Sequence, residues 1–449
     1  MIRRIIRGIL RIALRVYFRR IEVTGLENVP RDSPVIFVLN HPNGLVDPAF
    51  LLCLAPRRVA FVAKAPLFHM PVIGYLVRAL DSLPAYRRQD EGQDVSRNIE
   101  TFTAARKLLA RGVTIGICPE GVSHDEPRLK PLKTGAARIA LAAASSGEAI
   151  DLQIVPVGLY YTEKTTFRSS ALLYFAAGIP IKAVQLEPDG TPPRLAVREL
   201  SDQIEKGMRE VMLHAEQEEA LSLIERAERI FSAAEVGEAE EEQDLARSLE
   251  LRQRFIAGYA FYRGHSPRRL DAIEARIARF EYEMKQAGID PSDLSLPPTA
   301  AHTIFSLLAQ VITCVLLSPF AVFGTVLHYP AYRFGGFLSR RLARREQDVL
   351  STFKIISAML FFPLTWVVVG LISWTLGGWV WGVSALIITP ACGYIAVRFF
   401  EEIDRFFGSF VALALFVTRR RAFVRLLAER AAIRRDILEL GDEAALRTN

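Results

Sequence analysis

Short apolar runs that alternate with amphipathic stretches characterise the first half of the chain. Four of these runs predict buried strands because they are rich in Val, Ile and Leu and bounded by turn residues, at 35–39, 59–63, 113–117 and 154–160. Residues 92–112 have the period of an amphipathic helix, and a second helix is predicted from Thr134 to about Ser146, before Gly147. This alternation predicts an α/β domain over residues 21–215, with a mostly parallel or mixed sheet flanked by helices.

The hydrophobic pattern changes in the last third of the chain, where we expect a membrane region over residues 301–400. Residues 355–397 contain no charged side chain over 43 positions, whereas about 20 are enough to cross a bilayer. A transmembrane hairpin that turns at 375–378 is therefore predicted. A second uncharged stretch, 303–332, is also expected in the membrane, and a buried pair of core helices is the alternative.

Arginine-rich segments flank these stretches and set the expected topology. The loop 333–354 and the basic helical tail 401–449 both carry an excess of arginine. The positive-inside rule places them on the cytoplasmic face with the first domain. The stretch 303–332, which lies between the first domain and this loop, must then enter and leave the bilayer by one face, so a re-entrant segment at about 303–330 that breaks at Pro319 is expected.

A basic amphipathic helix is predicted for residues 1–20. Its apolar residues recur at helical spacing, with arginines mostly on the other side. This pattern is typical of a helix that lies on anionic lipid, and a basic helix packed on the first domain is the alternative. The apolar positions are Ile2, Ile5, Ile6, Ile9, Leu10, Ala13, Leu14 and Tyr17.

A charged helical region covers residues 216–300. Apolar residues at a and d spacing predict antiparallel helices at about 243–263 and 267–287 that bury them against each other, with Pro267 opening the second. The acidic run 235–244 is expected to be a solvated linker or helix face. The recurring apolar residues are Leu270, Ile273, Ile277, Phe280 and Met284.

Composition excludes several classes of protein. A chain of 449 residues is long enough for two or three domains. Its four cysteines have no paired spacing, so neither a disulfide framework nor a cysteine metal site is predicted. The net charge of +7 is accounted for by the N-terminal and membrane-flanking arginines, which argues against a nucleic-acid partner.

Two polar motifs follow predicted strands. Asn40-His41-Pro42-Asn43-Gly44-Leu45-Val46-Asp47-Pro48 follows the strand at 35–39, and Cys118-Pro119-Glu120-Gly121 follows the strand at 113–117. Open α/β sheets carry their sites at the carboxyl ends of strands, so the two motifs are expected to meet at one edge. A base and an anion-holding loop at that edge indicate an enzyme.

These motifs resemble those of the glycerolipid acyltransferases, whose signature is His-x-x-x-x-Asp followed by a Pro-Glu-Gly block. The five residues between His41 and Asp47 and the extension Ser123-His124-Asp125 are similar to the glycerol-3-phosphate/dihydroxyacetone-phosphate subfamily. Segments 74–87 and 154–160 resemble two further family motifs. The resemblance covers about 21–215 and implies the mixed-sheet fold of that family.

The resemblance also implies the chemistry. His41 would be the general base, and Asp47 would hold the other ring nitrogen and stabilise the imidazolium. Gly44 could absorb the extra residue of the loop with an unusual backbone angle. The substrate supplies the attacking hydroxyl and acyl-CoA supplies the acyl group as a co-substrate, so no cofactor and no metal are expected.

Substrate-binding residues are implied in the same way. Arg87 matches the family's phosphate-binding arginine, and Glu120 with Gly121 matches the block that holds the glycerol-phosphate part. Lys64 and Lys133 are supplementary candidates, with surface solvation as the alternative. The sequence leaves three readings open: acylation of glycerol 3-phosphate, acylation of a lysophospholipid such as lysophosphatidic acid, and a non-catalytic lipid-binding membrane scaffold.

Overall fold

The computed structural model describes residues 2–87, 90, 94–124, 126, 128–147, 151–212, 223, 226, 245–287, 300–343, 347–418 and 420–448. The chain forms two compact units. The first comprises Met1–His214 together with Ser339–Ile355, and the second comprises Ala215–Leu338 together with Ile356–Asn449. The predicted acidic linker at 235–244 lies outside the described residues.

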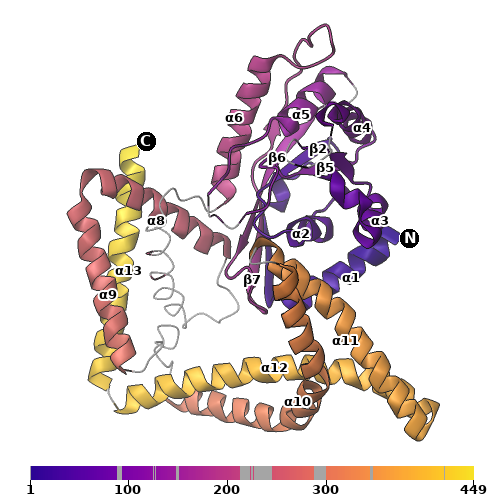
Figure 1. Ribbon diagram of the computed structural model, residues 1–449. Coiled ribbons are helices and arrows are strands. Elements are labelled where there is room, and N and C mark those ends of the chain that lie inside the picture. The colour runs from indigo at the N-terminus through magenta and orange to yellow at the C-terminus, as the bar shows by residue number, and fades with distance from the viewer. Residues whose placement is uncertain are drawn as a thin grey trace. The chain divides into compact units, whose positions relative to one another are not determined.

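A mixed sheet forms the centre of the first unit (Figure 1), as the sequence predicts. Its strands run in the order β1-β7-β6-β2-β5-β3-β4, with β8 paired to β6. Five neighbouring strands, β6, β2, β5, β3 and β4, are parallel, and β7 is antiparallel to β6. The strands are β1 (Arg20–Thr24), β2 (Val35–Leu39), β3 (Val59–Lys64), β4 (Leu83–Ala85), β5 (Thr114–Ile117), β6 (Gln153–Tyr161), β7 (Ser170–Phe175) and β8 (Ile179–Pro180).

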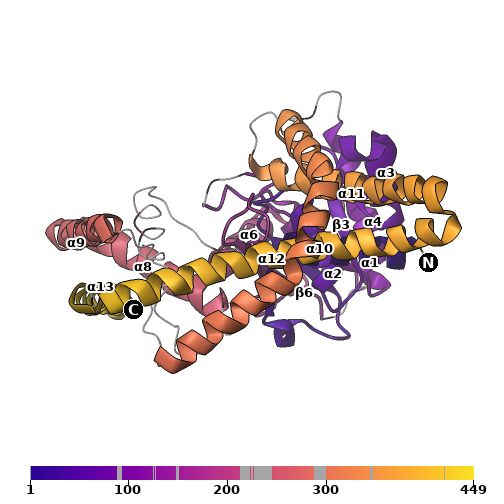
Figure 2. The same ribbon diagram turned by 90° about the horizontal axis from the view of Figure 1, so that it is seen from below.

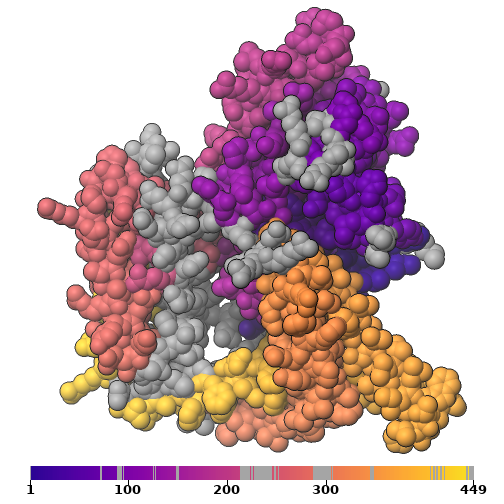
Figure 3. Space-filling view, viewed as in Figure 1, coloured from indigo at the N-terminus to yellow at the C-terminus, as the bar shows by residue number. Residues whose placement is uncertain are grey.

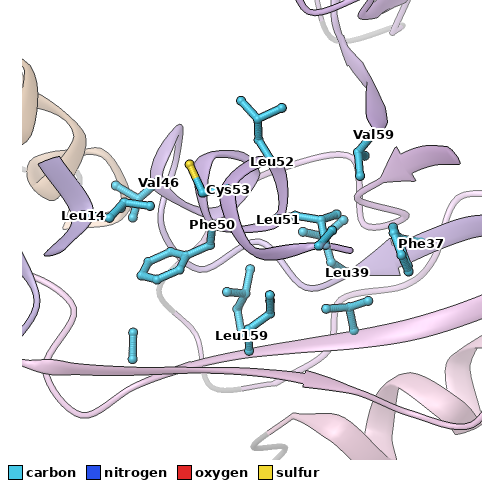
Figure 4. Packing of buried hydrophobic residues seen from close by; sticks show 14 of the residues in the cluster. Leu14, Phe37, Leu39, Val46, Phe50, Leu51, Leu52, Cys53, Val59 and Leu159 are labelled. Atoms are coloured by element: carbon cyan, nitrogen blue, oxygen red, sulfur yellow. The ribbon is translucent and has the colours of Figure 1, made fainter. Parts of the chain in front are cut away.

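Helices cover both faces of this sheet, because its central strands are apolar on both sides. In β2, Phe37 belongs to a core cluster with α1 and α2, whereas Ile36 belongs to a second cluster with α4, α5 and α6. Figure 4 shows Leu51 of α2 packed toward Leu39 of the sheet, and Phe50 of the same helix belongs to this cluster. The helices of this unit are α1 (Ile2–Tyr17), α2 (Val46–Leu54), α3 (Pro71–Ala79), α4 (Asn98–Ala110), α5 (Gly135–Ser145) and α6 (Arg194–Val211).

The apolar face that the sequence predicts for helix α1 is partly buried against the first unit and partly exposed. Leu10, Ala13, Leu14 and Tyr17 pack against the core, and Arg7 and Arg11 donate hydrogen bonds to the Cys53 carbonyl (3.1 and 2.8 Å). The helix is therefore packed on its domain by part of its apolar face and by its arginines. A separate apolar stripe stays exposed: Ile2, Ile5, Ile9, Ile12 and Val16.

The second unit contains a bundle of three long helices, α8 (Leu245–His265), α9 (Pro267–Ala287) and α13 (Arg420–Thr448). The sequence predicts the first two, including Pro267 at the start of α9, but pairs them only with each other. In the structure α13 shares their core, and Arg276 of α9 forms an ion pair with Glu429 of α13 (2.6 Å). The arginine-rich tail therefore packs in a bundle because its own apolar residues complete the hydrophobic cluster.

Among the described residues, three helices are long and apolar enough to cross a membrane. They belong to α10 (Ala300–Leu342), α11 (Gln347–Gly377) and α12 (Trp379–Thr418). Helices α11 and α12 meet at Gly378 (φ +83°), within the turn that the sequence predicts for a hairpin. A Cβ atom added at Gly370 of α11 would lie 2.9 Å from the Leu386 side chain of α12. The absence of a side chain at Gly370 therefore allows the two helices to pack closely.

The break expected at Pro319 is absent, because α10 continues as a helix through Pro319 and Pro330. A proline inside a helix removes one hydrogen bond and bends the helix without necessarily ending it, and Figure 2 shows α10 bent along its length. Its later part packs on α11 through Phe334 and Phe361, whose ring centroids are 5.1 Å apart (orange in Figure 3).

Candidate active site

The parallel strands bring the predicted residues to one edge of the sheet. Val38 of β2 pairs with Ile117 of β5, and His41 and Glu120 each follow that pair by three residues. β3 and β4 continue the parallel set beyond β5. In the spatial order β4, β3, β5, β2, β6, the residues at the carboxyl ends are Arg87, Lys64, Glu120, His41 and Tyr161.

His41 and Asp47 form the hydrogen bond that the sequence predicts. The His41 Nδ1 and the Asp47 Oδ2 are 2.9 Å apart, and the Asp47 side chain is fully buried. Because a carboxylate only accepts hydrogen bonds, Nδ1 carries the proton in the neutral imidazole and Nε2 has a free lone pair. No described residue forms a hydrogen bond with Nε2, and the His41 side chain is 20% exposed. The ring is therefore oriented as a general base.

Two further groups hold the Asp47 carboxylate. The Asn43 backbone N–H donates to Oδ2 (2.7 Å), and the Tyr161 hydroxyl donates to Oδ1 (2.5 Å). Burial, reinforced by the Asp47 charge, raises the pKa of Tyr161 well above its ordinary value, so the phenol stays protonated and donates. Tyr161 lies outside the sequence motifs, and the only signal for it in the sequence is its position at the carboxyl end of a predicted strand.

The longer loop between His41 and Asp47 takes the form predicted from its glycine. Gly44 has φ +37°, which an L-residue rarely adopts, and Asp47 lies in the first turn of α2. The Asn40 side chain fixes the start of the loop by pairing with the Leu159 backbone of β6, at 3.0 Å to its carbonyl and 2.7 Å from its N–H. The extra residue therefore leaves the His41–Asp47 contact intact.

One carboxylate oxygen of Glu120 has no hydrogen-bond partner in the part of the chain that the structure describes. Its Oε2 accepts hydrogen bonds from the Lys130 backbone N–H (2.9 Å) and from the His124 ring. Its Oε1 is buried and has no hydrogen-bond partner among the described residues. A buried carboxylate oxygen without a partner is costly, so this atom is suited to accept a hydrogen bond from a substrate hydroxyl.

His124 connects the two motif loops. Its backbone N–H donates to the His41 carbonyl oxygen (3.2 Å), while its ring contacts Glu120. His124 therefore holds the two loops together. Gly121, the residue after Glu120, has φ +75°. The backbone therefore turns at the point where the substrate is expected to approach.

Arg87 points from β4 toward the glycine loop. Its Nη1 donates to the Gly121 carbonyl oxygen (2.5 Å), while Nε and Nη2 donate to the Asp90 carboxylate (2.8 and 2.6 Å). The hydrogen bond from Arg87 lowers the pKa of Asp90, so this carboxylate stays charged. The predicted phosphate-binding arginine is thus at the site edge but carries a carboxylate partner that the sequence analysis did not identify. Its neighbour Arg88 lies outside the described residues.

The lysine candidates are exposed at the same edge. Lys64 is close enough to Asp90 to contribute to the lowered pKa of that carboxylate. Lys133 lies beside the glycine loop, where a Cβ atom on Gly121 would be 3.5 Å from its Cγ. Their binding roles, like those of Glu120, Gly121 and Arg87, stay predictions.

No described Cys, His, Asp or Glu side chains form a group of three or more that could hold a metal ion, and the prediction that no metal is needed stays a prediction. Burial, with smaller contributions from Asp47 and Glu120, raises the pKa of the Cys118 thiol well above its usual range. Because the thiolate is the nucleophilic form, this shift argues against Cys118 as a nucleophile.

Comparisons with known proteins agree with this reading. Residues 20–160 match the family described as Acyltransferase, and residues 236–445 match the family described as glycerol-3-phosphate acyltransferase 2 C-terminal domain. Two relatives in Saccharomyces cerevisiae, glycerol-3-phosphate O-acyltransferases 1 and 2, are each 26% identical, over 78% and 60% of this chain. The chain spans 58% and 37% of their lengths.

A solved structure, the 1-acyl-sn-glycerophosphate acyltransferase of Thermotoga maritima, is 20% identical, covers 45% of this chain and 78% of its own, and has a TM-score of 0.33. The two family matches and the yeast relatives cover both halves of the chain. The chain therefore carries an acyltransferase-family domain, followed by a region of the glycerol-3-phosphate acyltransferase 2 C-terminal family.

Proposed function

We propose that the protein transfers a fatty acyl group from acyl-CoA to the hydroxyl of glycerol 3-phosphate, forming lysophosphatidic acid. One observation carries the proposal: His41 Nδ1 is 2.9 Å from the buried Asp47 carboxylate, and its Nε2 is left without a partner among the described residues. A base held in this way is suited to remove a proton from a substrate hydroxyl.

The proposed reaction needs no protein nucleophile. The acceptor oxygen attacks the thioester carbonyl carbon, and His41 Nε2 takes the hydroxyl proton. The carbon–sulfur bond then breaks, and the CoA thiolate leaves with that proton from the imidazolium. Asp47 stabilises the imidazolium between the two proton transfers, and general-base assistance contributes about 10²–10⁴-fold. We propose that neither a metal nor an organic cofactor takes part.

Glycerol 3-phosphate is the proposed acceptor on three grounds. The yeast relatives carry that substrate in their names, and they match most of this chain. The spacing of five residues between His41 and Asp47 resembles the same subfamily. Arg87 supplies a guanidinium for the phosphate, and Glu120 Oε1 supplies an unused acceptor for a second hydroxyl. A lysophosphatidate acceptor would lack one free hydroxyl.

The test is acyl transfer by membranes that contain the protein, with palmitoyl-CoA and one acceptor at a time. Product from glycerol 3-phosphate, with or without product from dihydroxyacetone phosphate, and its loss in His41→Ala would support the proposal. Product from lysophosphatidic acid alone would assign the second acylation step instead. Product from none of the acceptors would contradict the proposal and favour the scaffold reading.

We also propose that α11 and α12 cross the bilayer as a hairpin, with the catalytic domain on the cytoplasmic face. Their apolar length supports the hairpin, and the arginines of 333–354 support the orientation. The exposed stripe of α1 would then lie against the same membrane surface.

The contacts of Ser339–Ile355 add a condition on α10. This segment belongs to the catalytic unit, so it lies on the same side of the bilayer as that unit. Between Val211 and Asp348 the sequence has one uncharged stretch long enough to cross, at 303–332. A single crossing by α10 is therefore incompatible with these contacts, and we propose that it enters and leaves by one face.

Single cysteines at Phe305 and at Arg340, near the two ends of α10, test this arrangement. Both side chains are exposed. In sealed vesicles a membrane-impermeant maleimide should label both from the same side, and permeabilised vesicles provide the control. Labelling from opposite sides would contradict the proposed path.

A further inference from the structure

The first turns of α11 form part of the catalytic unit, although they are about 300 positions from the histidine motif in sequence. Ser351 is fully buried, and Thr352 and Ile355 are 6% and 8% exposed. Ile355 joins the core cluster that contains α1 and α2. The membrane-side helix thus begins inside the core of the catalytic domain.

This segment contacts the loop between His41 and Asp47. The Leu45 backbone N–H donates to the Thr352 Oγ1 (3.0 Å). At Gly44, an added Cβ atom would lie 2.9 Å from Thr352 Oγ1 and 3.0 Å from the Asp348 carbonyl oxygen. The loop bulge at Gly44 and the start of α11 therefore fit closely, and the extra residue of the loop lies where α11 covers it.

The same segment contacts the loop that carries Glu120. The Ser123 hydroxyl donates a hydrogen bond to the Asp348 carboxylate. Asp348 is thus joined to one motif loop and Thr352, one turn later in α11, to the other. Since His124 already links those two loops through the His41 carbonyl, α11 adds a second brace between them.

Other hydrogen bonds fix the position of this brace. The Ser351 hydroxyl donates to the Lys164 carbonyl oxygen (2.5 Å), and the Lys354 ammonium donates to that of Thr165 (2.7 Å). The Tyr17 hydroxyl of α1 donates to Ser351 (3.3 Å). The segment is therefore held by α1 and by the chain after β6, independently of its contacts with the motif loops.

We propose that Asp348 and Thr352 are positioning residues for acyl transfer, which hold the loops of His41 and Glu120 in register from the start of α11. The inference rests on the proposed function. A purely structural role is the alternative, because an acidic residue in the first turn also stabilises a helix N-terminus. The two roles differ in which kinetic parameter a substitution changes.

Thr352→Val removes the acceptor of the Leu45 N–H at nearly constant volume, and Thr352→Ser keeps it. The Thr352 hydroxyl contacts the Leu45 backbone, so a positioning role predicts a kcat lower by about five- to tenfold in Thr352→Val with little change in KM. Thr352→Ser should retain most of the activity. A loss of folded protein with unchanged kcat per folded molecule would indicate a structural role and overturn the proposal.

The contact between Ser123 and Asp348 can be tested by a double-mutant cycle. Ser123→Ala leaves the helix N-terminus unchanged, so it separates positioning from helix stabilisation. If the two side chains act together, kcat in the Ser123→Ala/Asp348→Asn double variant should fall no further than in Asp348→Asn alone. Strictly additive losses would contradict the proposed brace.

A disulfide at the same contact gives a readout that does not depend on activity. In the Ser123→Cys/Asp348→Cys protein, oxidation in membranes should form a cross-link that neither single variant shows, whatever reaction the enzyme catalyses. Activity that is low when reduced and recovers on oxidation would show that the braced arrangement is the active one. A cross-link that abolishes activity, or no cross-link at all, would overturn the proposal. Inactivity of the unmodified protein toward every acceptor, with the cross-link still formed, would reject the proposed function alone.

Discussion

The two ends of the catalytic sheet edge differ in how their charges are balanced. At β2 the Asp47 carboxylate is buried and receives three hydrogen bonds, from His41, Asn43 and Tyr161. At β4 the Arg87 guanidinium is paired with Asp90, whose side chain is 12% exposed, through two hydrogen bonds. The imidazole proposed as the base is therefore held in place by the fold, whereas the cation proposed for the phosphate already holds a negative group. Binding of a phosphate at β4 would have to compete with Asp90.

Removing the cation should have the largest effect at the β4 end. Arg87→Ala is expected to raise KM for glycerol 3-phosphate by about 10–100-fold, since a charge-assisted hydrogen bond contributes about 1.5–3 kcal/mol. The kcat should change less, because the base at β2 is untouched. Arg87→Lys is the control, as it keeps the charge but loses the planar fork. Equal KM values in wild type and Arg87→Ala would remove Arg87 from the phosphate site.

At the β2 end, Tyr161→Phe should act on kcat and leave KM nearly unchanged. The substitution removes the hydrogen bond to Asp47 Oδ1 and leaves a buried carboxylate oxygen unpaired. We expect kcat to fall by about tenfold, because such an unpaired group costs about 1–3 kcal/mol. Steady-state kinetics with both substrates would measure this. A rise in KM without loss of kcat would mean that Tyr161 acts on binding and not on the base.

Asp90→Asn should have the smallest effect and the opposite sign. Its charge is maintained in the folded protein because the hydrogen bond from Arg87 lowers the pKa of the carboxyl. Neutralising it should free Arg87 and lower KM for the phosphate acceptor by about two- to fivefold, the size of a partly exposed ion pair. An increase in KM would instead show that Asp90 orients Arg87 for binding.

The strands that the sequence predicts are largely buried. β2, β3, β5 and β6 are continuous apolar runs because helices cover each side of the sheet. Three of the strands that it misses are short, as β4 and β8 are, or contain charges, as β1 does, whereas β7 is missed although it is apolar and mostly buried. Their pairing depends on partners far away in the chain, as between β1 and β7. The local pattern of apolar and polar residues cannot predict a strand partner that is far away in the chain.

The site residues fall into two groups for the same reason. His41, Asp47, Glu120 and Gly121 lie within short motifs whose spacing is visible in the sequence. Tyr161 reaches Asp47 across 114 positions, and Thr352 reaches Leu45 across 307. These contacts exist only after the sheet and α11 have assembled, so no local pattern predicts them. Pro319 is a different case, because a helix can continue through a proline that local rules treat as a break.

The distance between neighbouring strands also bears on the length of the acceptor molecule. Neighbouring strands lie about 4.8 Å apart, and β5 is the direct neighbour of β2. Arg87 reaches from β4 to the loop after β5, which is the strand next to the one that ends at His41. If Arg87 binds the phosphate as we propose, a hydroxyl only a few bonds away would lie next to the imidazole. The order of the strands would then favour a short polyol phosphate over a long one.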